Sequence, residues 1–126
     1  MRTISDTYRP MIAKKIAAVF FAGESGAEPV RNWLKSLPRP DQKKIGDDIR
    51  TVEFGWPIGM PVCRPLGKGL YEVRTNLKDR IARVLFAIED GEMVLMHGFI
   101  KKAQTAPIDL ELARTRLNIY RQRTRE

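Results

Sequence analysis

The side chains of this sequence best suited to chemistry are cations that stand in or beside apolar stretches. Arg74, Arg83, His97 and Lys101 lie within or at the ends of three segments rich in Val, Ile, Leu and aromatic residues, a composition typical of β-strands. Charged side chains are seldom buried without a partner, so their place in such segments needs a reason. A site that grips phosphate would supply one, because the guanidinium fork matches phosphate oxygens in a bidentate way.

Other kinds of chemistry find little support in the sequence. One histidine, one cysteine and scattered carboxylates offer no compact set of metal ligands. The glycines of Gly67-Lys68-Gly69 lack the spacing and the following helix of a phosphate-binding P-loop. No serine or cysteine stands in a nucleophile motif. We therefore expect neither a metal nor a cofactor.

Length and charge limit the classes of protein that fit. The chain has 126 residues, enough for one hydrophobic core but short for two. Hydrophobic residues make up 43% and charged residues 30%, a balance typical of globular domains and not of disordered chains. The net charge of +8 favours an acidic partner, which could be nucleic acid, an anionic membrane surface or an acidic protein. A basic protein without such a partner is the alternative.

Cysteine usage and hydropathy indicate the compartment. Cys63 is the only cysteine, so the chain forms no internal disulfide and suits a reducing cytoplasm. An apolar run at residues 16–22 follows Lys14 and Lys15, as in a secretion signal. It is at the short limit for such a signal and too short to cross a bilayer. We expect a cytoplasmic protein without membrane contact, in which this run forms the first core strand.

The elements that must position the cations begin after a short lead. We expect residues 1–14 to form a flexible arm and residues 15–126 a single domain. A strand is predicted from Lys15 to Phe21, bounded by glycines. Pro29 suits the first turn of a helix, and a second helix is predicted from about Asp41 to Phe54. The apolar sides of the two helices are Val30, Trp33, Leu34 and Leu37, then Ile45, Ile49, Val52 and Phe54.

The middle of the chain predicts a loop followed by a meander of strands. Residues 55–69 are dense in Gly and Pro, with room for a short strand near residues 62–66. Strands are then predicted at residues 70–75, 80–89 and 92–99. Residues 76–79 form the first connecting turn, and Asp90-Gly91 is a hairpin signal for the second.

Pro107 opens a final helix, on which Ile108, Leu112 and Leu117 mark an apolar side. Arginines crowd its end. Together these elements predict an α+β fold, with a small antiparallel or mixed sheet of four to five strands. An N-terminal helical hairpin would pack on this sheet, and the C-terminal helix would complete the domain.

Three stretches carry a resemblance to a known family: residues 69–74 (Gly-Leu-Tyr-Glu-Val-Arg), residues 83–88, and residues 97–102 (His-Gly-Phe-Ile-Lys-Lys) with Pro107 after them. In this order they resemble the RelE/ParE toxins of bacterial toxin–antitoxin pairs, in particular the HigB-like, phage-derived branch. The resemblance extends from about Lys15 onward. It implies a RelE/ParE-like fold and a toxin that is either a ribosome-dependent mRNA endonuclease or an inhibitor of DNA gyrase.

Cleavage of RNA without a metal requires the 2′-hydroxyl to lose its proton, the pentacovalent phosphate to be stabilised and the leaving 5′ oxygen to gain a proton. Guanidinium groups can stabilise the phosphate, and histidine exchanges protons near neutral pH. The resemblance places Arg83 at the position of a catalytic cation, and Arg74 and Lys101 at further cationic positions. The predicted catalytic residues are Arg74, Arg83, His97 and Lys101.

Further residues are predicted to contact RNA. Tyr71 could stack on a splayed base or act as a weak acid, and Arg80 and Lys102 would add charge against the backbone. The RelE-type nucleases often have a tyrosine or histidine shortly after the last strand, where this chain has Gln104 and Thr105. The nearest downstream tyrosine is Tyr120, so the group that transfers protons stays open.

Each candidate also has a plainer interpretation. Arg74 and Arg83 could form surface salt bridges or bind a partner protein. His97 could be a structural histidine beside Phe99, and residues 101–102 a solvated turn. The arginines of the last helix are either a solvated face or an electrostatic footprint for RNA.

The function predicted from these observations is that of a toxin that cleaves mRNA. Its expected partners are a cognate antitoxin, mRNA and the ribosome. Two alternatives remain open: a non-enzymatic, ParE-like inhibitor of gyrase, and a phage-derived binding module without toxicity.

Overall fold

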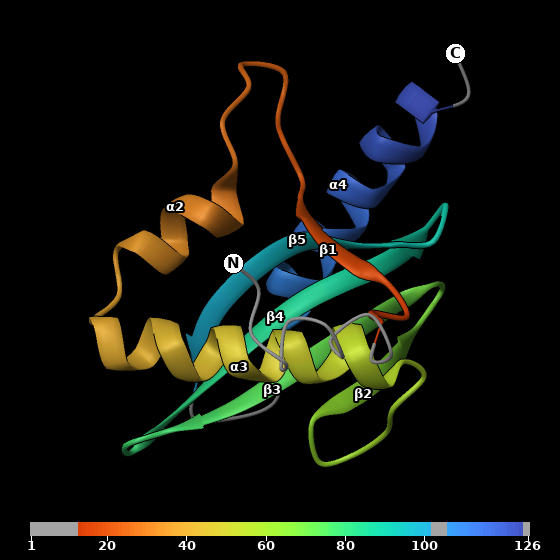
Figure 1. The fold of residues 1–126 in the computed structure, drawn as a ribbon. Coiled ribbons are helices and arrows are strands. Elements are labelled where there is room, and N and C mark those ends of the chain that lie inside the picture. Colours follow the sequence, from red (N-terminus) through yellow and green to blue (C-terminus); the bar gives the residue numbers. More distant parts are fainter. Residues whose placement is uncertain (1–12, 102–105, 125–126) are drawn as a thin grey trace, which may run out of the picture.

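The computed structural model describes residues 13–101 and 106–124, and over this part the chain is a mixed α+β fold with a five-stranded sheet and three helices (Figure 1). This agrees with the predicted fold class. The strands are β1 (Ala17–Phe20), β2 (Cys63–Gly67), β3 (Leu70–Leu77), β4 (Arg80–Glu89) and β5 (Glu92–Lys101). The helices are α2 (Pro29–Lys35), α3 (Arg39–Gly55) and α4 (Pro107–Thr124).

The strands are ordered β1-β5-β4-β3-β2 across the sheet. Strand β1 runs parallel to β5, and every other pair of neighbours is antiparallel. The β4–β5 turn is Asp90-Gly91, as predicted, and both residues have positive φ (52° and 76°), which suits a two-residue hairpin. The first turn is tighter than predicted, because β3 continues to Leu77 and only Lys78 and Asp79 lie outside the strands.

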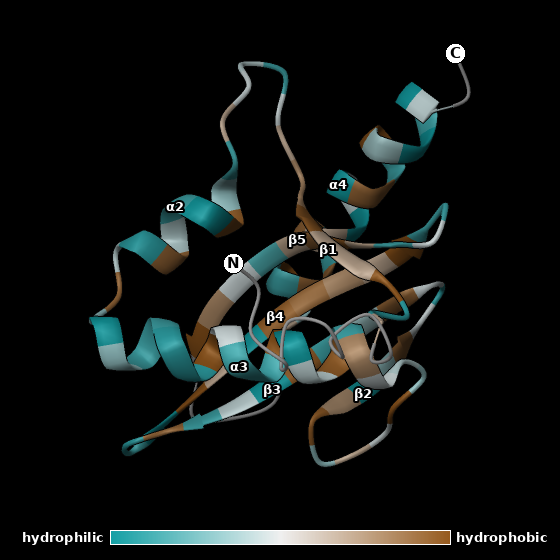
Figure 2. Ribbon diagram, viewed as in Figure 1, coloured by the Kyte–Doolittle hydropathy of each residue, from teal (hydrophilic) through white to brown (hydrophobic). Residues whose placement is uncertain are grey.

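Each face of the sheet has its own hydrophobic core. Helices α2 and α3 cover one face, where Ile45, Val52 and Phe86 are fully buried. Helix α4 covers part of the other face through Ala113 and Leu117. Figure 2 shows apolar residues along β4, between the helices, while the outer sides of α2 and α3 are largely hydrophilic. The sheet is therefore the middle layer, and its two faces can carry different functions.

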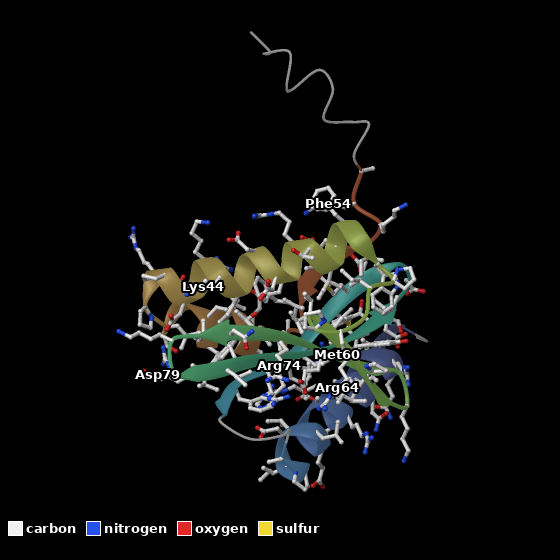
Figure 3. All side chains as sticks on the ribbon, turned by 90° about the horizontal axis from the view of Figure 1, so that it is seen from below. Lys44, Phe54, Met60, Arg64, Arg74 and Asp79 are labelled. Carbon is white, nitrogen blue, oxygen red and sulfur yellow. The ribbon has the colours of Figure 1, made fainter. Side chains whose placement is uncertain are left out.

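Strand β1 is shorter than predicted because Glu53 competes for its backbone. The carbonyl oxygen of Glu53 accepts hydrogen bonds from the amides of Lys15 and Ile16, so these residues do not pair with β5. The Glu53 carboxylate is buried and accepts from the amide of Ala18 at 2.8 Å and from Lys14 Nζ at 3.1 Å. Phe54, predicted on the apolar side of α3, instead lies on its outer side (Figure 3).

The apolar side predicted for α4 is only partly correct. Leu117 is buried, but Ile108 is 72% exposed and Leu112 is 37% exposed. Ala113 is buried in their place. Successive residues of a helix are rotated by about 100°, so the turn of α4 that brings Ala113 and Leu117 onto the sheet directs Ile108 and Leu112 outward.

Of the predicted arm at residues 1–14, only residues 13 and 14 lie among the described residues. Within the described part of the chain, no helix is long and apolar enough to span a bilayer.

Candidate functional site

The register of the sheet places two predicted site residues, Arg74 and Arg83, in one row with Phe99. Arg74 on β3 lies opposite Arg83 on β4, and Arg83 lies opposite Phe99 on β5. Directly opposed residues of antiparallel strands point to the same face. Phe99 belongs to the core beneath α4, so Arg74 and Arg83 are also on the face that carries α4.

A second row lies beside the first on the same face. It contains Arg64 on β2, Glu72 on β3, Leu85 on β4 and His97 on β5, each opposite the next. Glu72 and Arg74 are two positions apart, as are Arg83 and Leu85, and alternate residues of a strand share a face. We refer to Arg64, Glu72, Arg74 and Arg83 as the arginine cluster.

The centre of the arginine cluster is a buried ion pair. Arg83 and Glu72 are 4% and 1% exposed, and Arg83 Nη1 donates a hydrogen bond to Glu72 Oε1. The other carboxylate oxygen, Oε2, lies 3.5 Å from Arg64 Nη2. Two guanidinium groups thus share one carboxylate, and with Arg74 beside them the cluster carries a net positive charge.

Arg64 and Arg74 are the members of the cluster that reach the surface. The side chain of Arg64 is 36% exposed, and Arg74 is half-buried. Figure 3 labels both on the side of the sheet where α4 lies. Arg74 also borders a hollow of about 310 Å³ at the edge of β3. The other residues that line this hollow are Lys44, Asp47, Asp48, Pro61, Val62, Thr75 and Asn76.

His97 is held from both sides by α4. Its Nε2 lies 2.8 Å from Asp109 Oδ1, and its Nδ1 lies 3.4 Å from Arg116 Nη1. Because a guanidinium only donates, Nδ1 accepts and the proton is on Nε2. Arg116 Nη1 also donates to the carbonyl oxygen of Met96 at 2.7 Å, and the ring stacks on Phe99 with centroids 5.3 Å apart. This geometry favours the structural interpretation of His97.

Two other titratable groups, Cys63 and Tyr120, have raised pKa values, which keeps them protonated at neutral pH. Burial, followed by the charge of Glu72, raises the pKa of the Cys63 thiol to about 11, so the thiol is neutral at physiological pH. Burial raises the pKa of Tyr120, and the charges of Glu92, Asp90 and Glu89 add to the effect. Tyr120 of α4 is thus close to the acidic residues of the β4–β5 turn.

The structure separates Tyr71 and Arg80 from the arginine cluster. Tyr71 lies on the opposite face, where its ring contacts Trp56 and Phe86 at centroid distances of 4.9 and 5.5 Å. Arg80 begins β4 and pairs with Asp41 at the start of α3. Both side chains therefore have structural partners away from Arg74 and Arg83.

The structure describes the backbone of Lys101 but not its side chain, and it does not describe Lys102. The backbone of Lys101 ends β5, opposite Ile81, two residues beyond Phe99. The side chain of Lys101 and all of Lys102 lie outside the described residues. Among the residues that the structure does describe, no group of three or more His, Cys, Asp or Glu side chains could hold a metal ion.

Glu72 and Arg64 are the members of the cluster that the sequence interpretation missed. Glu72 could have been found, because it precedes Arg74 by two positions in a predicted strand and a buried carboxylate needs a cation. Arg64 gave no signal, since it stands in a segment dense in Gly and Pro.

The chain matches the model of a known protein family. Residues 32–118 match the model of the family described as Phage derived protein Gp49-like (DUF891). The matched span includes the arginine cluster, His97 and most of α4. No curated protein matches the chain.

Proposed function

Since the chain belongs to the Gp49-like family of phage-derived proteins, which often serve as toxins of toxin–antitoxin systems, we propose that it is such a toxin. In this proposal it acts in the bacterial cytoplasm, where it cleaves mRNA in the decoding site of the ribosome. A cognate antitoxin binds the toxin and inhibits it. Its fold would be that of the RelE/ParE superfamily, with α2 and α3 as the helical hairpin.

The observation that carries the proposal is the arginine cluster itself. Three guanidinium groups from three adjacent strands lie together on one face, and the cluster is open to solvent at Arg64 and Arg74. A phosphodiester fits this charge and donor set. When the 2′ oxygen attacks phosphorus, negative charge grows on the phosphoryl oxygens, and fixed guanidinium groups stabilise that charge.

The proposed reaction forms a bond between the 2′ oxygen and phosphorus and breaks the bond from phosphorus to the 5′ oxygen. The 2′ proton passes to a base, and the 5′ oxygen receives a proton. In this scheme Arg74 and Arg64 contact the phosphate, while Arg83 adds its charge from behind them. Lys101 is proposed as a further cation. His97 would transfer protons only after its contact with Asp109 or Arg116 opens.

Expression in a bacterial host tests the proposal. We would compare wild type, Arg74→Ala and Arg50→Ala, and map transcript ends by primer extension. Arg50 is a matched control, because it is an exposed arginine on the outer side of α3, paired with Asp47 of the same helix. We expect growth arrest with new 5′ ends for wild type and Arg50→Ala, and neither for Arg74→Ala. Wild-type expression without growth arrest would contradict toxicity and favour an inert binding module.

A gyrase inhibitor is the second candidate, and one observation favours it. Both ring nitrogens of the only histidine are occupied by α4, which leaves the cluster without a ready proton carrier among the described residues. Growth arrest with intact transcripts, together with loss of DNA supercoiling by purified gyrase, would decide for this function and against RNA cleavage.

A further inference from the structure

The arginine cluster contains a carboxylate at its centre, where a negative charge would repel a bound polyanion. Glu72 lies at the centre of the arginine cluster and is 1% exposed. An ionised carboxylate is retained in a protein interior only when cations and hydrogen bonds compensate its lost hydration. Because Glu72 would repel RNA, its presence in the cluster indicates another role.

The contacts of Glu72 link three strands. From β3, the carboxylate meets Arg83 of β4 with one oxygen and Arg64 of β2 with the other. An arginine has five N–H donors in a rigid plane, so donation to Glu72 fixes the plane of each guanidinium. Arg64, whose side chain is 36% exposed, can present further donors to a second anion. Glu72 is thus placed to set the orientation of both guanidinium groups.

The register adds a second reason. Arg74 and Arg83 oppose each other directly, and like charges in such pairs repel. Glu72 is adjacent to both, since it is the next residue on its face of β3 and is bonded to Arg83. The carboxylate therefore lets two arginines occupy one rung of the ladder.

We propose that Glu72 is a positioning residue of the phosphate site, which holds Arg83 and Arg64 in the orientation that stabilises the transition state. This inference rests on the proposed function and assigns a role within the same site. Orientation of fixed donors affects the rate of the chemical step, whereas net charge affects RNA affinity. Removal of the Glu72 charge should therefore lower the rate of the chemical step without weakening RNA affinity.

The test is Glu72→Gln, which keeps the size of the side chain and one acceptor oxygen. Single-turnover cleavage of ribosome-bound mRNA should slow by roughly a hundredfold. Binding of a short RNA should be unchanged or tighter, because the site loses a negative charge. Glu89→Gln is the matched control, since Glu89 pairs with Arg121 at the far end of β4 and should leave both quantities at their wild-type values.

A spectroscopic readout separates this inference from the proposed function. Nitrogen NMR of the arginine side chains reports how freely each guanidinium rotates. In wild type, the Arg83 guanidinium should rotate slowly, and in Glu72→Gln quickly. If wild type cleaves no RNA but this change is seen, the nuclease proposal fails while the orienting contact stands. An unchanged Arg83 signal would overturn the inference.

Two further results would also overturn it. One is a folded Glu72→Gln protein that cleaves at the wild-type rate. The other is a loss of rate and of RNA binding in parallel with the fraction of protein unfolded, because a purely structural role predicts that pattern. Should Glu72→Gln fail to fold, Glu72→Asp keeps the charge on a shorter stem; slower cleavage with unchanged RNA affinity would support the inference, and wild-type cleavage would overturn it.

Discussion

Arg74 and Arg83 face each other directly across the β3–β4 ladder, yet only Arg83 is buried. One arginine of the pair is available to a ligand, and the other is part of the interior of the sheet. Substitution of Arg74 therefore tests ligand binding, whereas substitution of Arg83 also tests the stability of the sheet.

Arg83→Ala should destabilise the protein more than Arg74→Ala. Removal of Arg83 leaves Glu72 buried with one of its cations missing, and breaking a buried pair in this way costs about 3 kcal/mol. Arg74→Ala removes a half-buried cation at the exposed end of the arginine cluster and should cost less than about 1 kcal/mol. Urea unfolding of both variants measures the difference. Equal losses would show that the Glu72–Arg83 pair contributes little to folding.

His97→Ala should loosen the start of α4. The imidazole joins β5 to Asp109 and Arg116, so its loss removes hydrogen bonds worth about 1 to 2 kcal/mol in total. Amide hydrogen exchange should become faster in the first turns of α4 and stay unchanged in α3. Glu111→Ala, an exposed change in the same part of α4, is the control. Unchanged exchange in His97→Ala would argue against an anchoring role.

Gly98→Ala should disturb the contact between α2 and β5. A Cβ at this position would lie 2.3 Å from Trp33 Cε3, so the indole must move, at a cost of about 1 to 3 kcal/mol. Trp33 fluorescence and the urea midpoint should both change. Gly46→Ala is the counterpart: nothing lies within 4 Å of its added Cβ on α3, and stability should rise by up to about 1 kcal/mol. A stable Gly98→Ala protein would mean that α2 can shift away from the sheet.

Cys63 should resist alkylation in the folded protein. Its folded pKa of about 11 lies above the ordinary value of 9.0, so iodoacetamide at about pH 8 should react only after unfolding. Between these two pKa values the unfolded chain loses the thiol proton and the folded protein keeps it. Stability contributed by this group is thus constant below pH 9.0 and falls as the pH rises toward 11. Cys63→Ala should lack that fall in urea midpoint.

Much of the fold follows from local signals in the sequence. Strand β4 begins and ends where predicted, because a segment of apolar residues, interrupted by Arg83, lies between two polar turns. Helices α2 and α4 begin at Pro29 and Pro107, residues that suit a first turn. Such signals act over a few residues and need no knowledge of the partner element.

Features that depend on distant partners were harder to predict. The apolar residues Ile108 and Leu112 suggested the wrong side of α4, because the sheet selects the side through Ala113 and Leu117. The shortening of β1 depends on Glu53, which no periodicity reveals. The position of Tyr71 was within reach, since it is an odd number of residues from Arg74 and alternation places the two on opposite faces.

The parallel pairing of β1 with β5 has a consequence for the timing of folding. Ala17 pairs with Glu92 and Phe20 with Leu95, so β1 cannot pair until β5 has been synthesised. Contacts between such distant residues form slowly and cannot be completed on a chain still emerging from the ribosome. The arginine cluster needs β2, β3 and β4, and its α4 cover needs β5 as well. A nascent chain therefore lacks the finished face of the sheet that carries the arginine cluster until nearly all of the described sequence has emerged.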